Sequence, residues 1–336
     1  LHLSAPEAPM QAAGLDSLGA LDLAGRVERD LGVALPVGAL LDGMSARALV
    51  DHLLREVARD QDGSPTWSPR RLLVLQPVRV RRPLFFVGGA FGASLYLQPL
   101  ARALGEGQPF FALQYPGLGA DEAPLRTVEE MARCFLADVR AVQPEGPYML
   151  GGHSFGGLVA YEMAQQLLRS GAEVSHLFLA DTSPVVESPA DAGDPELMAL
   201  FELLNCFLRL AGRPAGAGPL LDELAGQPPD EQRRRLQAAL ARQDGVPPGF
   251  PLDRLLAIFA ANVAAMRRYR PLPIARSAVL LRAQEGFPAR SLHPGRAIRL
   301  RFHEATFGWE EVVGRLQVIA VPGDHFSMVT APHVQG

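Results

Sequence analysis

The chain has 336 residues, of which 48% are hydrophobic and 20% are charged, with a formal net charge of −4. This length suits one large domain plus a small one, and the composition is that of a globular protein, which excludes disorder throughout the chain. No run of about 18 apolar residues predicts a membrane span, and no basic stripe predicts binding to nucleic acid.

The two cysteines, Cys134 and Cys206, lie far apart without neighbouring ligands. Their separation predicts neither a disulfide framework nor a zinc site, and we expect no metal. The sequence does not begin with the basic stretch and apolar run that are typical of a signal peptide, so we expect a cytoplasmic location.

The first segment has apolar residues at helical spacing after Ser17, interrupted by glycine and proline. This pattern predicts a small helical domain over residues 1–58. Residues 59–71 are polar and contain glycine and two prolines, which is typical of a linker. We therefore expect the large domain to occupy residues 72–336.

Beyond the linker, short apolar runs alternate with helical patterns, as a mostly parallel sheet covered by helices requires. Thr127 and Glu130 have the spacing of a capping box, which predicts a helix over 128–142. The predicted strands are 72–78, 84–87, 109–114, 148–151, 174–180, 278–281 and 316–321.

Between residues 185 and 275 the strand rhythm stops and three helical patterns follow, at about 195–210, 230–241 and 252–269. This region predicts a helical insertion in the α/β domain. Some of its helices have apolar residues on more than one side, whereas a surface helix needs only one apolar stripe.

The strongest local signal is Gly152-His153-Ser154-Phe155-Gly156, between a predicted strand and a helical pattern. This G-x-S-x-G sequence in that context predicts a nucleophile elbow, a tight turn that exposes the serine hydroxyl. Side chains two residues either side of the serine would clash in such a turn. The alternative is a glycine-rich turn without chemistry.

A serine hydroxyl needs a base and a third group that orients the base, and in this architecture their chain order is serine, acid, histidine. Asp181 ends the strand expected at 174–180, and His325 follows the strand expected at 316–321. We therefore predict Asp181 as the acid and His325 as the base. Asp324 is the alternative acid.

We expect the backbone N–H of Phe155 to form half of an oxyanion hole. The glycine-rich loop 88–92 follows an early strand, and we choose Ala90 for the second N–H. The loop lacks the G-x-G-x-x-G spacing of a dinucleotide site. His153, inside the elbow, is expected to point away from the nucleophile.

The large domain resembles the terminal thioesterase domains of polyketide, nonribosomal-peptide and fatty-acid synthases, over about residues 72–328. The resemblance implies an α/β-hydrolase fold in which Ser154, Asp181 and His325 form a triad and residues of about 185–275 form a lid over an acyl channel. Its motifs are FFV at 85–87, LQYPGL at 113–118 and EGPYMLGGHSFGG at 145–157.

The sequence GLDSL at 14–18 resembles the attachment site of acyl-carrier domains, more those of polyketide than of peptide synthases. The resemblance implies that a phosphopantetheinyl transferase attaches 4'-phosphopantetheine to Ser17. A helix cap is the alternative interpretation. Only 16 residues precede Ser17 and 11 follow His325, so both the carrier's first helix and a closing helix are expected to be missing or truncated.

Together these features predict the C-terminal carrier and type I thioesterase region of a modular polyketide synthase, working with the upstream synthase domains. The acyl chain on the carrier phosphopantetheine would move to Ser154 and then to water or an internal hydroxyl. Two alternatives are a free-standing esterase of the same fold and an inactive module that only docks the carrier. The sequence does not identify the acyl chain, the oligomeric state or the choice between hydrolysis and cyclisation.

Overall fold

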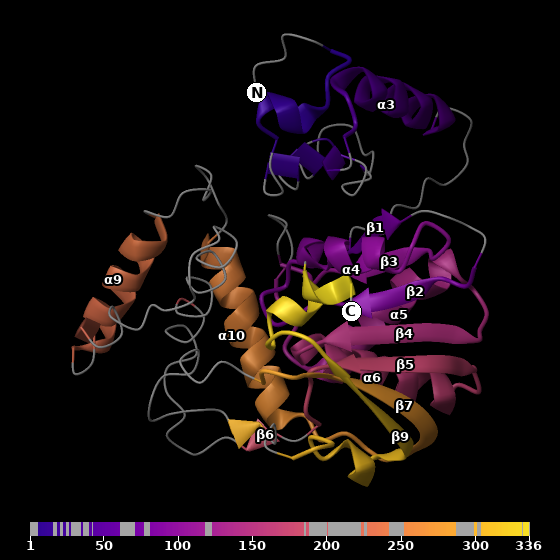
Figure 1. The fold of residues 1–336 in the computed structure, drawn as a ribbon, viewed down its shortest axis with the longest axis vertical. Coiled ribbons are helices and arrows are strands. Elements are labelled where there is room, and N and C mark those ends of the chain that lie inside the picture. The colour runs from indigo at the N-terminus through magenta and orange to yellow at the C-terminus, as the bar shows by residue number, and fades with distance from the viewer. Residues whose placement is uncertain are drawn as a thin grey trace.

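The structure is a computed structural model, and the residues it describes are 6–15, 19–20, 23–24, 27, 35, 40–41, 43–60, 71–76, 81–117, 123–184, 186–187, 200, 223–224, 227–241, 252–286, 299–300, 304–330 and 332–335. Its centre is a seven-stranded sheet with strand order β1-β3-β2-β4-β5-β7-β9 (Figure 1). β1 is antiparallel to β3, and every other neighbouring pair in this sheet is parallel. The predicted mostly parallel sheet is confirmed.

The predicted strands are all present, with ends that differ by up to a few residues. Val87 of β2 lies opposite Gly152 of β4, and His153 lies opposite Ala180 of β5. The carboxyl ends of the central strands are therefore level with one another. The strands are β1 (Leu72–Gln76), β2 (Leu84–Val87), β3 (Phe110–Leu113), β4 (Tyr148–His153), β5 (Val174–Ala180), β7 (Ile274–Ala283) and β9 (Val313–Val321).

Both faces of the sheet are covered, and β2 shows how. Its side chains point alternately to the two faces. Phe85 and Val87 join the core that α5 and α6 cover, whereas Leu84 and Phe86 join the core under η2 and α4. The continuous apolar sequence of this strand follows from burial on both sides. The helices are η2 (Leu95–Leu97), α4 (Gln98–Ala103), α5 (Val128–Val142) and α6 (Phe155–Arg169).

α5 begins where the sequence predicts, because Thr127 caps it. The Thr127 hydroxyl accepts a hydrogen bond from the backbone N–H of Glu130 at 3.2 Å. The Glu130 carboxylate reaches back to the N–H of Arg126 at 3.4 Å, one residue before the position a capping box would use.

The N-terminal segment contributes η1 (Met10–Ala13) and α3 (Ala46–Asp60), which lie beyond the β1 side of the sheet (Figure 1). Leu15, Leu40 and Leu49 are buried in the same core as α4. The Arg102 guanidinium on α4 donates to the carbonyl of Leu41 at 3.5 Å. Most of the predicted linker lies outside the described residues.

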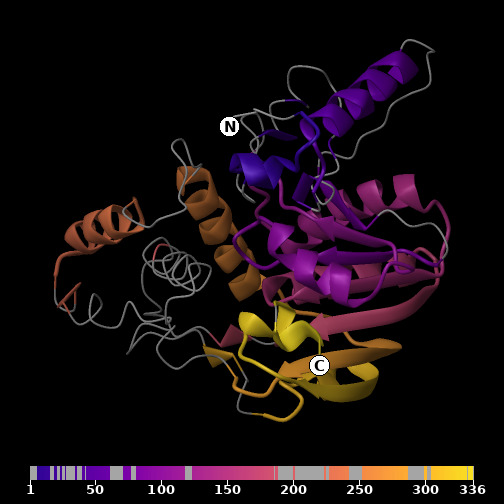
Figure 2. The same cartoon turned by 45° about the horizontal axis from the view of Figure 1, so that its top comes forward.

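The predicted helical insertion is present between β5 and β7. Its described helices are α9 (Pro229–Ala241) and α10 (Leu252–Arg268), and Figures 1 and 2 both place α10 against the sheet domain with α9 further out. The pattern predicted at 195–210 lies outside the described residues except for Leu200, which is buried. No helix among the described residues is long and apolar enough to cross a bilayer.

A second, two-stranded sheet, which the sequence does not predict, flanks the insertion. β6 (Val186–Glu187) pairs antiparallel with β8 (Arg299–Leu300). Two residues cannot show the alternation that identifies a strand, so no sequence signal was available. The remaining short helices are η3 (Trp309–Glu311), η4 (Ser327–Val329) and η5 (His333–Gln335).

Candidate active site

Ser154 stands on a strained turn between β4 and α6. Its φ is 56° and its ψ is −129°, a conformation that non-glycine residues rarely adopt. The flanking glycines make this turn possible. A Cβ on Gly152 would lie 2.1 Å from the carbonyl oxygen of Gly156, and a Cβ on Gly156 would lie 2.2 Å from that of Gly88. The predicted elbow geometry is therefore present.

Three side chains far apart in the sequence meet beside this turn. The His325 Nε2 atom lies 3.0 Å from Ser154 Oγ, and its Nδ1 atom lies 2.7 Å from Asp181 Oδ2. A carboxylate only accepts hydrogen bonds, so in the neutral ring Nδ1 carries the proton and Nε2 is left to accept from the serine hydroxyl. This is the orientation that a general base requires.

Asp181 is completely buried and fixed by the neighbouring strand. Its Oδ1 atom accepts a hydrogen bond from the backbone N–H of Ala283 at 3.0 Å, and its own N–H donates to the carbonyl of Leu281. The residue has a φ of 46°, a second non-glycine residue with positive φ at this edge of the sheet. β5 and β7 thus hold the carboxylate against His325.

Asp324, the alternative acid, has another role in the structure. Its Oδ1 atom accepts from the backbone N–H groups of Phe326 and Ser327, at 3.0 and 2.9 Å. The carboxylate shapes the turn that follows His325, and the imidazole bonds to Asp181 instead.

The loop expected to supply an oxyanion donor passes directly beside the elbow. A Cβ on Gly89 would lie 3.8 Å from Ser154 Cβ. The N–H of Gly89 itself donates to the Tyr96 hydroxyl at 2.8 Å, which leaves the next N–H, that of Ala90, as the candidate. Phe155 is the first residue of α6, where backbone N–H groups have no partner within the helix. The roles of Ala90 and Phe155 stay predictions.

His153, the residue before the nucleophile, packs beside the triad. Its ring does not bond to Ser154, but it packs against the imidazole of His325 with the ring centres 5.0 Å apart. Its Nε2 atom lies 2.7 Å from the carbonyl oxygen of His325, and its Nδ1 atom lies 2.8 Å from the Tyr96 hydroxyl. Burial, followed by the proximity of His325, lowers the pKa of His153 from 6.5 to about 3. The ring is therefore neutral near pH 7.

α10 packs over the loop that contains Ala90. The ring of Phe259 stacks on that of Phe91 with centres 4.7 Å apart, and Ile258 lies against Gly92. Asn262, 1% exposed, donates from its Nδ2 atom to the carbonyl of Ala90 at 2.8 Å. The helical insertion thus touches the loop beside the nucleophile.

Ser17, the predicted attachment serine, lies outside the described residues. Upstream of it, Gly14 adopts a left-handed conformation with φ of 92°, and Leu15 is 4% exposed. Leu15, two residues before the serine, thus packs into the core of the N-terminal segment. The described residues contain no group of three or more potential metal ligands.

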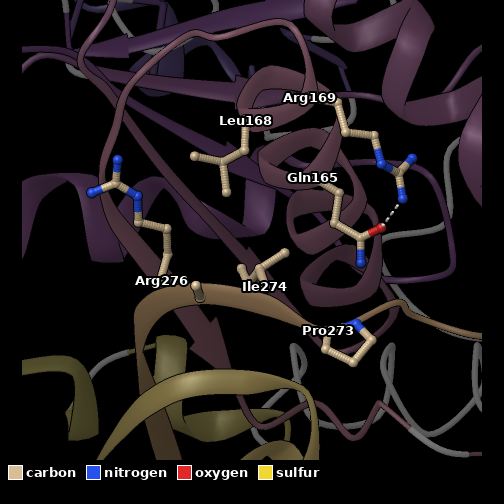
Figure 3. A pocket seen from close by; sticks show the side chains of 7 residues that line it. Gln165, Leu168, Arg169, Pro273, Ile274 and Arg276 are labelled. Atoms are coloured by element: carbon tan, nitrogen blue, oxygen red, sulfur yellow. Dashed lines mark hydrogen bonds between the residues drawn. The ribbon is translucent and has the colours of Figure 1, made fainter.

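A surface hollow of about 320 Å³ lies elsewhere, where the end of α6 meets the start of β7 (Figure 3). Its lining includes Gln165, Arg169 and Arg276, and the Arg169 guanidinium donates to the Gln165 side chain at 3.0 Å. Because strand β7 begins here, the hollow is at the amino ends of the parallel strands, whereas Ser154 is at their carboxyl ends. None of the residues of the triad lines it.

The fold and the geometry around Ser154 define an α/β-hydrolase. Residues 82–335 match the thioesterase domain family, and the chain belongs to that family. Residues 2–53 match the phosphopantetheine attachment site family, whose members carry covalent 4'-phosphopantetheine. The chain thus combines a carrier segment with a thioesterase domain.

The similar proteins are synthases of two kinds. The chain is 29% identical to chondramide synthase of Chondromyces crocatus over 96% of its length, and 29% identical to a polyketide synthase of Bacillus subtilis over 52%. It spans only 8% and 7% of those two relatives. A crystal structure of a four-domain nonribosomal peptide synthetase matches 95% of this chain and 23% of its own, with 26% identity and a TM-score of 0.67.

Proposed function

We propose that this chain is the chain-releasing region of a polyketide synthase, in which Ser154, His325 and Asp181 transfer an acyl group from a carrier thioester. The observation that carries the proposal is the pair of contacts of 3.0 and 2.7 Å from His325 to Ser154 and Asp181. The match to a phosphopantetheine attachment family beside the thioesterase domain supports a carrier-bound substrate, with Ser17 as the attachment residue.

In the first half of the reaction, His325 Nε2 takes the hydroxyl proton as Ser154 Oγ attacks the thioester carbonyl. Asp181 holds the ring and stabilises the imidazolium that forms. Negative charge develops on the carbonyl oxygen, where the N–H groups of Phe155 and Ala90 would stabilise it. When the carbon–sulfur bond breaks, His325 returns its proton to the departing thiol, leaving an ester on Ser154.

In the second half, His325 removes a proton from water or from a hydroxyl of the acyl chain, and that oxygen attacks the carbonyl carbon of the Ser154 ester. The bond from this carbon to Ser154 Oγ then breaks, and His325 returns the proton to Oγ, which restores the serine hydroxyl. The phosphopantetheine arm, when attached, supplies the thioester and the reach from carrier to serine. Every proton transfer in this scheme uses the same Nε2 atom, which the structure already directs at Ser154.

The two alternatives differ in what they require. An inactive docking module does not need a base within hydrogen-bond distance of the serine, and a free-standing esterase does not need a carrier segment. The proposal accounts for both features. The choice of polyketide over peptide rests on the resemblance of GLDSL at 14–18 to polyketide carriers, since synthases of both kinds match this chain.

Mass spectrometry of the intact protein tests the proposal. The protein is incubated with N-acetylcysteamine thioesters of a hydroxyacyl chain and of a peptide of equal length. We expect the mass of the acyl group to appear on the peptide that contains Ser154, and faster with the hydroxyacyl chain by about tenfold, because one or two lost pocket contacts are worth that much. An unmodified Ser154 contradicts the proposed chemistry, and faster labelling by the peptide contradicts the polyketide assignment.

A charged substitution on α10 tests whether its apolar residues line an acyl channel or only pack in the core. If Phe259 faces the channel that the lid is expected to form, Phe259→Asp lowers kcat/KM for long acyl thioesters by tenfold or more beyond its effect on short ones, since a long apolar chain would remove water from the carboxylate. Ala265→Asp, on the face of α10 that is buried in the main apolar core, is the control and should lower the melting temperature instead. Equal losses for all chain lengths with Phe259→Asp contradict the channel.

A further inference from the structure

A continuous row of hydrogen bonds links the loop beside the nucleophile to the backbone of the general base. It runs from the N–H of Gly89 to the Tyr96 hydroxyl, from that hydroxyl to His153 Nδ1, and from His153 Nε2 to the carbonyl of His325, at 2.8, 2.8 and 2.7 Å. His153 is 4% exposed. None of these groups takes part in the proton transfers proposed above.

The direction of every bond in this row is determined by its ends. A carbonyl oxygen can only accept, so His153 Nε2 must carry the ring proton. Since the ring is neutral, Nδ1 must accept, and the Tyr96 hydroxyl must donate to it. The oxygen of Tyr96 then accepts from the N–H of Gly89. Each donor meets one acceptor, so the row is satisfied in one arrangement only.

The two ends of the row are the N–H of Gly89 and the carbonyl of His325, and no side chain of the triad bonds to either group. Asp181 orients the ring of His325 but does not touch its backbone, which otherwise bonds through its N–H to Gly286 at 3.1 Å. Gly89 precedes Ala90, whose N–H is the expected oxyanion donor. A displacement of about 1 Å in either group can reduce turnover by about a hundredfold.

We propose that Tyr96 and His153 are positioning residues. They fix the position of the loop at 88–92, which contains the expected oxyanion donor, relative to the backbone of His325. The elbow sequence therefore supplies two functions from adjacent residues, the nucleophile at 154 and this positioning ring at 153. The inference depends on the proposed function, because it assigns a role relative to Ser154 and His325.

Substitutions at His153 can restore one of the two hydrogen bonds of its ring at a time. Glutamine can place its amide nitrogen near the position of Nε2 and so donate to the His325 carbonyl, whereas asparagine reaches only the position of Nδ1. We expect His153→Leu and His153→Asn to lower kcat for a soluble acyl thioester by about a hundredfold with KM within threefold, and His153→Gln to recover at least tenfold of that loss. Tyr96→Phe should lower kcat by about tenfold.

Tyr161→Phe is the matched control. The Tyr161 hydroxyl, in the middle of α6, also serves two protein partners, the carbonyls of Leu272 and Val312, which lie just before β7 and β9. It should lower the melting temperature as Tyr96→Phe does and leave kcat unchanged. The inference is overturned if Tyr96→Phe keeps kcat within twofold, or if the asparagine and glutamine variants are equally active. Should a His153 variant not fold, the two tyrosine variants decide alone.

Ser154→Ala, measured in parallel, keeps the two proposals apart. If that variant still hydrolyses the thioester, the proposed function is wrong. If it is inactive while the Tyr96 and His153 variants match the unmodified protein, only the positioning roles are wrong.

Discussion

Ser154→Ala is expected to reduce hydrolysis of a soluble acyl thioester by at least about 10⁴-fold, because no other described side chain stands where the Ser154 Oγ atom meets His325 Nε2. The fold should survive, since alanine removes one oxygen and leaves the strained backbone of the elbow in place. Steady-state turnover of an N-acetylcysteamine thioester and the melting temperature of both proteins measure the two effects.

Ser17→Ala is the control for this experiment. A small thioester bypasses the carrier arm, so this variant should keep turnover within about twofold of the original protein, whereas it should no longer accept phosphopantetheine. Equal losses in the two variants would contradict the division between a carrier serine and a nucleophile. Residual turnover above about 1% in Ser154→Ala would identify another nucleophile.

The elbow and the sheet could be predicted from the sequence because their determinants are local. The turn at Ser154 depends on glycines within two positions of it, and a strand such as β2, whose residues are all buried, appears in the sequence as a short apolar run. The carboxyl ends of parallel strands then bring Asp181 and His325 to one edge. Chain order and strand ends were enough to select these residues.

The positioning row could not be predicted, because its determinants are not local. His153 bonds to the carbonyl of a residue 172 positions further along the chain, and a backbone carbonyl has no sequence signature. Tyr96 lies 57 positions before it, in a short helix that shows no pattern of its own. The sequence shows a histidine inside the elbow, but it does not show which groups that ring bonds to.

Asp181→Asn is expected to leave the fold intact and to reduce kcat by about 10⁴-fold. Asparagine can keep the bond that Asp181 Oδ1 accepts from the N–H of Ala283, because its amide oxygen can take that position. Its NH₂ group then faces His325 Nδ1, where a carboxylate oxygen was. An NH₂ group donates, so Nδ1 must accept and the ring proton moves to Nε2.

In that tautomer His325 presents a donor to Ser154 Oγ and can no longer take the hydroxyl proton. A 10⁴-fold loss corresponds to about 5.4 kcal/mol of transition-state stabilisation, while the melting temperature should change by only a few degrees. Asp324→Asn is the matched control, because its amide oxygen can still accept from Phe326 and Ser327, and turnover should stay within about threefold. If Asp324→Asn proves the more damaging change, the acid of the triad is not Asp181.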